Sequence, residues 1–270
     1  MQGGHTLTSR SKEYRLPAEN RADYVRENFD AIARRYDQFN DRITFGLHRL
    51  WKRAVVRATG LKRDSGQSVL DLCSGSGDIA LKLAAWTGPG ARVVAYDFSP
   101  QMLAVLQARI DGARAKKSLA TIEIEEGDAM DLARFTADTF DAVTIGFGLR
   151  NVTDRARCLA ECLRVLRPGG RLVILDVGRV PYRIPGYVHR WFFTRIVPRI
   201  GHWTHGSRHE MYDYLPASAE MYPGQEELKR EIEQAGFGPV HYRNFMLGAS
   251  VMHVAQKPTG EAIETISRRR

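Results

Sequence analysis

The apolar residues of the chain form short continuous runs that alternate with stretches of helical spacing. A continuous apolar run flanked by turn residues is typical of a strand that is buried on both faces. Such runs occupy residues 69–72, 92–96, 121–125, 139–146 and 171–177. Helical spacing recurs between them at 79–86, 100–110 and 153–166. This alternation predicts an α/β fold with a mainly parallel sheet, helices on both faces and right-handed crossovers.

The two ends of the chain add elements to this pattern. Helical stretches at 22–36 and 45–61 precede the first strand, and residues 179–223 interrupt the alternation. The sequence Arg-Pro-Gly-Gly at 167–170 predicts a turn. A helix is expected at 225–235, followed by strands at 240–246 and 250–256 that form an antiparallel hairpin. We therefore expect a doubly wound, seven-stranded, mainly parallel sheet with an antiparallel closing hairpin.

A glycine-rich loop follows the first predicted strand. Gly75 and Gly77 allow a sharp turn and close approach of a ligand to the backbone, and the next helix begins directly afterwards. Asp97 lies at the end of the second strand, twenty residues after Gly77. In a doubly wound sheet this places a carboxylate beside the loop, where it accepts hydrogen bonds from both ribose hydroxyls of a nucleoside. The sequence therefore predicts an adenosine-containing cofactor.

Two acidic residues indicate which cofactor this is. The loop formally fits the Gly-x-Gly-x-x-Gly/Ala dinucleotide fingerprint, a weak signal by itself. Asp71, however, would repel a pyrophosphate and suits a ligand with an ammonium and a sulfonium group, and Asp128 is placed to meet an adenine edge. The combination resembles the seven-strand, class I S-adenosylmethionine-dependent methyltransferases. The expected cofactor contacts are Asp71, Gly75, Ser76, Gly77, Asp97, Phe98, Asp128, Ala129 and Gly146.

Length and composition agree with one soluble domain. The chain has 270 residues, of which 43% are hydrophobic and 26% are charged, as in ordinary globular proteins. We expect a disordered extension at 1–20, a methyltransferase domain at 21–257 and a basic tail at 258–270. Cys158 and Cys162 are expected to be small buried side chains of one helix, and no spaced set of ligands predicts a metal site. The absence of a secretory signal or an apolar spanning segment favours a cytoplasmic protein.

The net charge of +9 is unevenly distributed. Residues 61–177 carry 15 basic and 15 acidic side chains, whereas residues 1–60 carry 12 and 7, and residues 178–222 carry 6 and 3. Basic segments beside a neutral fold are typical of a protein that meets an anionic surface, either nucleic acid or lipid headgroups. A solvated face that keeps the protein soluble explains the same pattern.

Longer motifs make a more specific resemblance. Tyr-Asp-Gln-Phe-Asn at 36–40, Phe-Gly-Leu-His-Arg-Leu-Trp-Lys-Arg at 45–53 and Gly-Phe-Gly-Leu-Arg-Asn-Val at 146–152 resemble the quinone-biosynthesis C-methyltransferases. The resemblance covers roughly residues 20–257. It implies methylation of a ring carbon of a prenylated hydroquinone, either demethylmenaquinol or a methoxy-polyprenyl-benzoquinol. Gly146 stands where the family often has serine, and the sequence leaves the quinone nucleus, the prenyl length and the oligomeric state, including a homo-oligomer, open.

The chemistry of such a transfer predicts the catalytic groups. A hydroquinone carbon becomes nucleophilic when its hydroxyl ionises, and a fixed cation favours the phenolate. Arg150, at the end of the fourth strand, is the expected cation, with Asn151 orienting a ring oxygen or a water. Asp128, His48 or a water held by Arg150 are candidates for the proton acceptor. Alternative interpretations are an ion pair between Arg150 and Asp154 and a His48 bonded to backbone.

The substrate contacts are expected on aromatic residues and on the insertion. Tyr36, Phe39, Asn40, Phe147 and Arg150 are predicted to line the ring pocket, with Trp191 contributed by residues 179–223. That insertion mixes apolar and cationic residues, which suits a helix at a lipid interface or a lid over a prenyl tail. We expect peripheral attachment to anionic lipid at the inner face of the membrane.

Other functions remain open at this point. The basic composition also suits an RNA methyltransferase, although no separate nucleic-acid module is apparent and we expect no nucleic-acid partner. A methyltransferase of another small aromatic or lipid acceptor fits the same motifs. A nicotinamide-dependent oxidoreductase, or a binding module without catalysis, shares the glycine loop.

Overall fold

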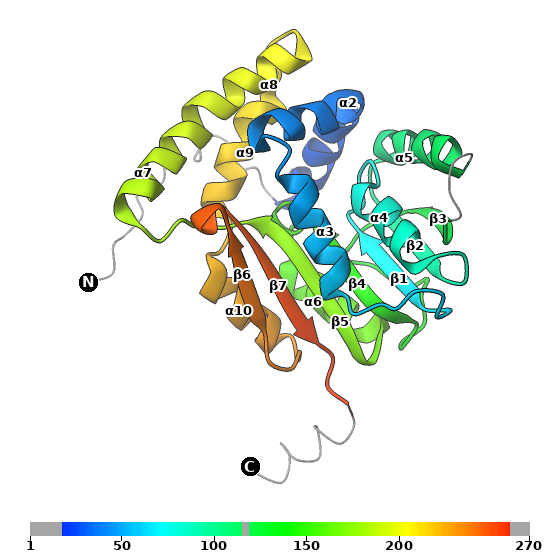
Figure 1. The fold of residues 1–270 in the computed structure, drawn as a ribbon. Helices are drawn as coiled ribbons and strands as arrows, with labels where there is room; N and C mark the ends of the chain where they lie inside the picture. Colours follow the sequence, from blue (N-terminus) through cyan, green and yellow to red (C-terminus); the bar gives the residue numbers. More distant parts are fainter. Residues whose placement is uncertain (1–17, 115–118, 260–270) are drawn as a thin grey trace, which may run out of the picture.

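A seven-stranded sheet forms the centre of the protein. The computed structural model describes residues 18–114 and 119–259, and Figure 1 shows the arrangement of their helices and strands. The strand order is β3-β2-β1-β4-β5-β7-β6. The strands are β1 (Ser68–Leu72), β2 (Arg92–Asp97), β3 (Thr121–Glu126), β4 (Phe140–Gly146), β5 (Leu166–Val177), β6 (His241–Phe245) and β7 (Ser250–Gln256).

The pairing of the strands confirms the predicted topology. β1 to β5 pair in parallel, and β7 is antiparallel to both β5 and β6. The predicted turn at 167–170 is different: β5 already begins at Leu166, and the register with β4 shifts between the pairs Phe140–Leu166 and Ala142–Arg171. Gly169 lies at this irregularity and has a φ of 79°, a left-handed conformation that occurs in β-bulges with glycine. Glycine thus bends this strand instead of ending it.

Helices cover both faces of the sheet, as the alternation predicts. One face packs against α6 (Arg155–Val165) and α10 (Gln225–Gln234), and Cys158 and Cys162 are buried there. The other face packs against α3 (His48–Ala58), α4 (Asp78–Thr87) and α5 (Pro100–Arg114). Alternate residues of each parallel strand enter the two cores, for example Leu70 on one side and Val69 on the other.

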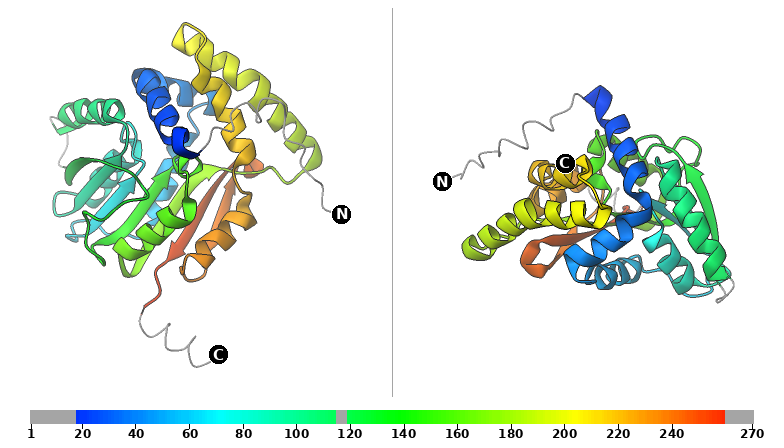
Figure 2. Two further views of the ribbon diagram at one scale, coloured as in Figure 1. Left: turned by 180° about the vertical axis from the view of Figure 1, so that it is seen from behind. Right: turned by 90° about the horizontal axis from the view of Figure 1, so that it is seen from above.

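A third group of helices lies beyond the carboxyl ends of the parallel strands (Figures 1 and 2). α2 (Ala18–Thr44) packs there with helices of the insertion around a separate apolar cluster. The insertion forms α7 (Arg183–Trp191), the π-helical segment η2 (Phe192–Ile196), α8 (Val197–His205) and α9 (Glu210–Met221). α2 begins within the extension expected at 1–20, and residues 1–17 of that extension and 260–270 of the tail lie outside the described residues.

Candidate functional site

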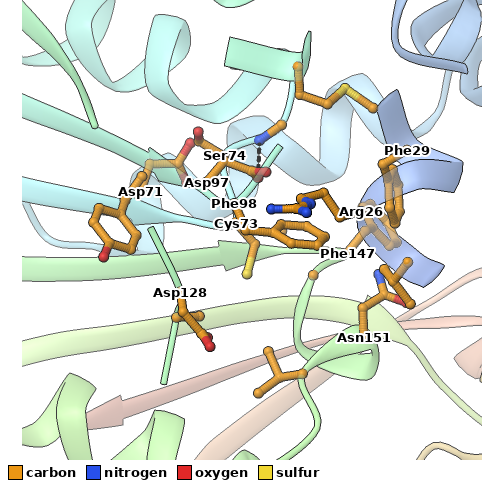
Figure 3. A pocket seen from close by; sticks show the side chains of 18 of the residues that line it. Arg26, Phe29, Asp71, Cys73, Ser74, Asp97, Phe98, Asp128, Phe147 and Asn151 are labelled. Atoms are coloured by element: carbon orange, nitrogen blue, oxygen red, sulfur yellow. Dashed lines mark hydrogen bonds between the residues drawn. The ribbon is translucent and has the colours of Figure 1, made fainter. Parts of the chain in front are cut away.

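A cavity of about 350 Å³ opens at the carboxyl ends of the parallel strands. Loops after β1, β2, β3 and β4 form one wall, and α2 forms the facing wall. Figure 3 shows Arg26 and Phe29 of α2 on one side of this cavity and Asp97 and Phe98 on the other. In open α/β sheets this edge is where ligands bind. The cavity is therefore the candidate site.

The glycine loop is built in the left-handed region of backbone conformation. Cys73, Gly75 and Gly77 have φ values of 55°, 54° and 81°. A Cβ atom on Gly77 would lie 2.1 Å from Leu106 Cδ1, whereas one on Gly75 would meet no atom within 4 Å. Gly75 lines the cavity. Gly77 is thus required by the packing of the loop on α5, and Gly75 by the space that a ligand occupies.

Asp97 is held beside this loop by backbone hydrogen bonds. The N–H of Gly75 donates to Asp97 Oδ2 at 2.8 Å, and the N–H of Ser99 donates to Asp97 Oδ1 at 2.9 Å. Burial raises the pKa of Asp97 to about 6, although these N–H groups oppose the increase. The two carboxylate oxygens have further lone pairs. These allow Asp97 to accept hydrogen bonds from ribose hydroxyls, as the predicted role requires.

Two buried polar atoms of the cavity wall have no hydrogen-bond partner among residues 18–114 and 119–259. Asp71 is 1% exposed, and its Oδ1 accepts a hydrogen bond of 2.6 Å from Thr144, while its Oδ2 has no partner. The hydroxyl of Ser74 is also unpaired. Burial raises the pKa of Asp71 to about 7. An unpaired buried acceptor is costly, so these atoms fit a polar ligand that carries a donor or a positive charge.

The remaining predicted cofactor residues also surround the cavity. Phe98, Asp128, Ala129 and Gly146 all line it. Asp128 is exposed, and its Oδ1 accepts from the N–H of Met130 at 2.8 Å. A Cβ atom at Gly146 would lie 2.3 Å from Ile79 Cδ1, so a serine at that position requires the end of this side chain to move. The structure thus brings the predicted cofactor contacts together at one edge of the sheet, except Gly77, which packs on α5 and does not line the cavity.

Hydrogen bonds tie α2 to the cofactor loops. Ser76 Oγ donates to Asp37 Oδ1 at 2.7 Å, so this predicted ligand residue also holds α2. Arg109 donates to Asp37 at 2.9 Å and to the carbonyl of Ser76 at 2.8 Å. A second tie joins Ser99 Oγ to Asp30 Oδ1 at 2.5 Å. The wall that covers the cavity is therefore fixed to the same loops that hold Asp97.

Arg150 lies behind the cavity wall and does not line the cavity. Its guanidinium is 5% exposed and pairs with Asp176 Oδ1 at 2.9 Å, rather than with Asp154. Burial lowers the pKa of Arg150, but Asp176 and Tyr36 outweigh this and hold it above the ordinary value. The same guanidinium donates to the carbonyl of Phe147. Arg150 consequently fixes the loop that carries Phe147 and Asn151.

Three predicted substrate-side residues do reach the cavity. Tyr36, Phe147 and Asn151 all line it, and Tyr36 meets Phe29 edge to face at 5.6 Å. Asn151 Oδ1 accepts from the hydroxyl of Tyr214 at 3.3 Å. Because the amide oxygen accepts there, a ligand acceptor beside Asn151 would receive its hydrogen bond from the NH₂ group.

Four other predicted residues lie away from the cavity. Phe39 is buried against Tyr212, with ring centroids 4.8 Å apart, and Asn40 accepts from Thr44 through its carbonyl. His48 is buried and hydrogen bonds to the hydroxyl of Thr44 at 2.8 Å, not to backbone, and burial lowers its pKa. Trp191 is 52% exposed on α7. No residue of the insertion is among the lining residues, so the insertion supports α2 and is not itself the cover of this cavity.

Sequence reasoning missed several lining residues. Val25, Arg26 and Phe29 of α2 face the cavity, as does Lys52 of α3. The spacing of Phe29 and Tyr36, seven residues apart, places both on one helix face and is a signal for the aromatic pair. Lys52 gave no signal, because its position beside the glycine loop depends on a contact with Asp78, 26 residues away.

Comparisons with known proteins agree with this geometry. A solved structure described as a SAM dependent methyltransferase from Aquifex aeolicus superposes with a TM-score of 0.54 at 19% identity, covering 76% of this chain and 89% of that chain. Demethylmenaquinone methyltransferase of Leptospira interrogans is 42% identical over 247 residues, 91% of this chain and 98% of the relative. Ubiquinone/menaquinone biosynthesis C-methyltransferase UbiE of Cronobacter sakazakii is 36% identical over 239 residues, 88% of this chain and 92% of the relative.

Fold and site together define an S-adenosylmethionine-dependent methyltransferase. The unpaired Asp71 and Ser74 atoms, the glycine loop and Asp97 fit that cofactor, which supplies an electrophilic methyl group when bound. The sequence model of the ubiE/COQ5 methyltransferase family matches residues 17–257, and the chain belongs to this family.

Proposed function

We propose that this enzyme transfers a methyl group to a ring carbon of a prenylated hydroquinone in menaquinone or ubiquinone biosynthesis. The names of the two relatives support the substrate class. The observation that carries the proposal is the composition of the half of the cavity next to α2. Phe29, Tyr36 and Phe147 provide aromatic surface for a flat ring, and Asn151 provides a polar donor at the same place.

Asn151 is the residue proposed to touch the ring oxygen. Methyl transfer from a sulfonium to carbon needs alignment and an electron-rich carbon more than covalent help from the protein. The NH₂ group of Asn151 stabilises negative charge on a quinol oxygen as the ring carbon attacks. Arg150 is proposed to act on the ring oxygen without touching it, by holding the loop that carries Asn151 and by its positive charge. Asp128 is the predicted proton acceptor that lines the cavity.

Quinone analysis in cells that lack this protein tests the reaction and identifies the nucleus. Mass spectrometry of extracted lipids is expected to show a desmethyl quinone, either the naphthoquinone or the benzoquinone type, and re-expression restores the methylated form. Purified enzyme is expected to add one methyl group to the matching reduced quinol. Unchanged quinones in the deletion strain, or transfer to water-soluble aromatics only, would exclude the proposal in favour of another acceptor.

We further propose that α7 attaches the enzyme to the membrane in which its substrate is dissolved. Ile184, Tyr187, Val188 and Trp191 follow the i, i+3, i+4, i+7 spacing of one helix face, and they are between 52 and 80% exposed. No residue of α7 is buried. An apolar helix face left in solvent favours an interfacial helix. Among residues 18–114 and 119–259, no helix is long and apolar enough to cross a bilayer.

The charge around α7 supports an anionic lipid surface. Residues 177–209 contain six arginines and no aspartate or glutamate. The neighbouring loop η3 (Met246–Gly248) exposes Met246 and Leu247, both at positive φ, and the N–H of Gly178 donates to Ala249 just after it. Two large apolar side chains held in solvent by an unfavourable backbone conformation extend the same surface. Phe192 and Phe193, in contrast, pack against the α2 cluster.

A further inference from the structure

The charged groups that line the cavity are mostly acidic. Six of them are carboxyl groups and two are cations, Arg26 and Lys52. S-adenosylmethionine carries an ammonium and a sulfonium group, which suit acids, but it also carries a carboxylate. The surrounding acidic groups repel this carboxylate, so its binding requires one of the two cations or backbone N–H groups.

Lys52 is the cation whose surroundings fit a buried carboxylate. It is 7% exposed, and its Nζ lies 2.7 Å from Asp78 Oδ2 at the first residue of α4. Arg26, in contrast, is half exposed on α2 and pairs with Asp23 of the same helix at 3.5 Å. Charge interactions are stronger away from water, and the N-terminus of α4 adds the favourable end of a helix dipole.

Three cations surround Asp78 at this point behind the glycine loop. Asp78 accepts from Lys52 and Arg109, and its backbone carbonyl accepts from Lys82. Arg109 is shared with Asp37. The group thus contains three cations and two carboxylates, and buried His48 has its pKa lowered.

Lys52 also lies within electrostatic range of the unpaired carboxyl group of Asp71. Burial raises the pKa of Asp71, and Lys52 is one of the groups that opposes this increase. Both residues line the cavity, and the Ser74–Ser76 segment of the glycine loop lines it with them. An amino acid group with an ammonium and a carboxylate on the same carbon matches an acid and a cation that face the same volume.

We propose that Lys52 binds the methionine carboxylate of S-adenosylmethionine while Asp71 accepts from its ammonium group. Lys52 then selects S-adenosylmethionine against decarboxylated S-adenosylmethionine, which keeps the adenosine, the sulfonium and the amine. The inference rests on S-adenosylmethionine as the cofactor. It does not depend on the quinol, because its test uses cofactor binding alone.

Calorimetric titration of the full chain with the two ligands tests this proposal. Wild type is expected to prefer S-adenosylmethionine over its decarboxylated form by about ten- to hundredfold, as a charge-assisted hydrogen bond implies. Lys52→Met is expected to remove most of that preference by weakening S-adenosylmethionine alone. Lys52→Arg, which keeps a cation beside Asp78, is expected to restore part of it. Arg26→Met is the matched control and is expected to retain the preference.

Four results would overturn the proposal. Equal binding of both ligands by wild type would show that no group recognises the carboxylate. An equal loss for both ligands in Lys52→Met would assign Lys52 a structural role through Asp78, and an unchanged preference would remove it from the site. Thermal unfolding shows whether Lys52→Met is folded. If it is not folded, the wild-type preference and its partial loss in Lys52→Arg decide the question. An intact preference in Lys52→Arg together with a lost preference in Arg26→Met would assign the carboxylate contact to Arg26 instead.

Discussion

The two walls of the cavity are built in different ways. The cofactor wall consists of loops that directly follow β1, β2, β3 and β4, and each places its cavity-lining residues at the end of its own strand. The covering wall is α2, whose position depends on distant partners. Its Asp30 and Asp37 bond to Ser99 and Ser76, and its Tyr24 lies edge to face with Tyr214 at 5.9 Å.

This difference explains how far the sequence alone is informative. On the cofactor wall, strand ends meet at one edge of the sheet, so the spacing of Asp71, Asp97 and Asp128 predicted their convergence correctly. On the covering wall, helical periodicity identifies which residues are apolar but not what they pack against. Phe39 and Tyr36 were therefore both predicted to contact the substrate, yet Phe39 packs against the insertion, whereas Tyr36 lines the cavity.

The first test, which includes a complete loss of cofactor binding, separates the packing role of Gly77 from the ligand space beside Gly75 in the cofactor wall. Gly77→Ala is expected to destabilise the fold by about 3 kcal/mol, from overpacking against Leu106 and the left-handed conformation together. Gly75→Ala has open space around its Cβ, so its stability loss is about 1 kcal/mol. Gly75→Val projects into the cavity and is expected to abolish cofactor binding while the chain stays folded. Urea unfolding measures the stability losses, and calorimetry measures cofactor binding. Equal stability losses at the two glycines would refute the distinction.

The second test concerns Arg150, which fixes the loop that carries Phe147 and Asn151. Arg150→Ala leaves Asp176 buried without its partner, so we expect a stability loss of about 3–5 kcal/mol. Pairing Arg150→Met with Asp176→Asn removes both charges and is expected to recover most of the stability. Turnover in this double variant is expected to fall about 10²–10³-fold with cofactor affinity retained.

The pH profile of the double variant shows how Arg150 acts. If its charge favours the phenolate, the defect shrinks as pH rises, because the quinol then ionises without help. Asn151→Leu is the matched variant, since it removes the proposed direct donor and leaves the Arg150–Asp176 pair in place. A defect that is constant with pH in the double variant would restrict Arg150 to ordering the loop.

The third test uses the raised pKa values of the cofactor wall. Asp71, with a pKa of about 7, must ionise to receive the ammonium group, so cofactor affinity is expected to fall at least tenfold from pH 7.5 to 5.5. Without ligand, the folded state binds more protons than the unfolded state between about pH 4 and 7, so stability decreases as pH rises through this range. Asp71→Asn is expected to bind weakly with a flatter profile. A steep profile retained in that variant would place the titrating group elsewhere, with Asp97 the next candidate.

The fourth test has the smallest expected effect and concerns the exposed apolar face of α7. Vesicle sedimentation is expected to show binding that increases with anionic lipid, since each arginine near such a surface contributes about 1 kcal/mol. High salt is expected to weaken this binding without abolishing it, because apolar side chains in the interface are insensitive to screening. Serine at Ile184, Tyr187, Val188 and Trp191 is expected to remove the residual binding and to slow turnover of long-chain quinols several-fold more than that of short-chain analogues. Trp203→Ser is the control, because Trp203 is 73% exposed, more than Trp191 at 52%, but lies on α8 under Arg42. Residual vesicle binding that survives the four serine substitutions would contradict a role of α7 in membrane attachment. Equal slowing of turnover for long-chain and short-chain quinols would mean that the substrate reaches the cavity without help from this helix.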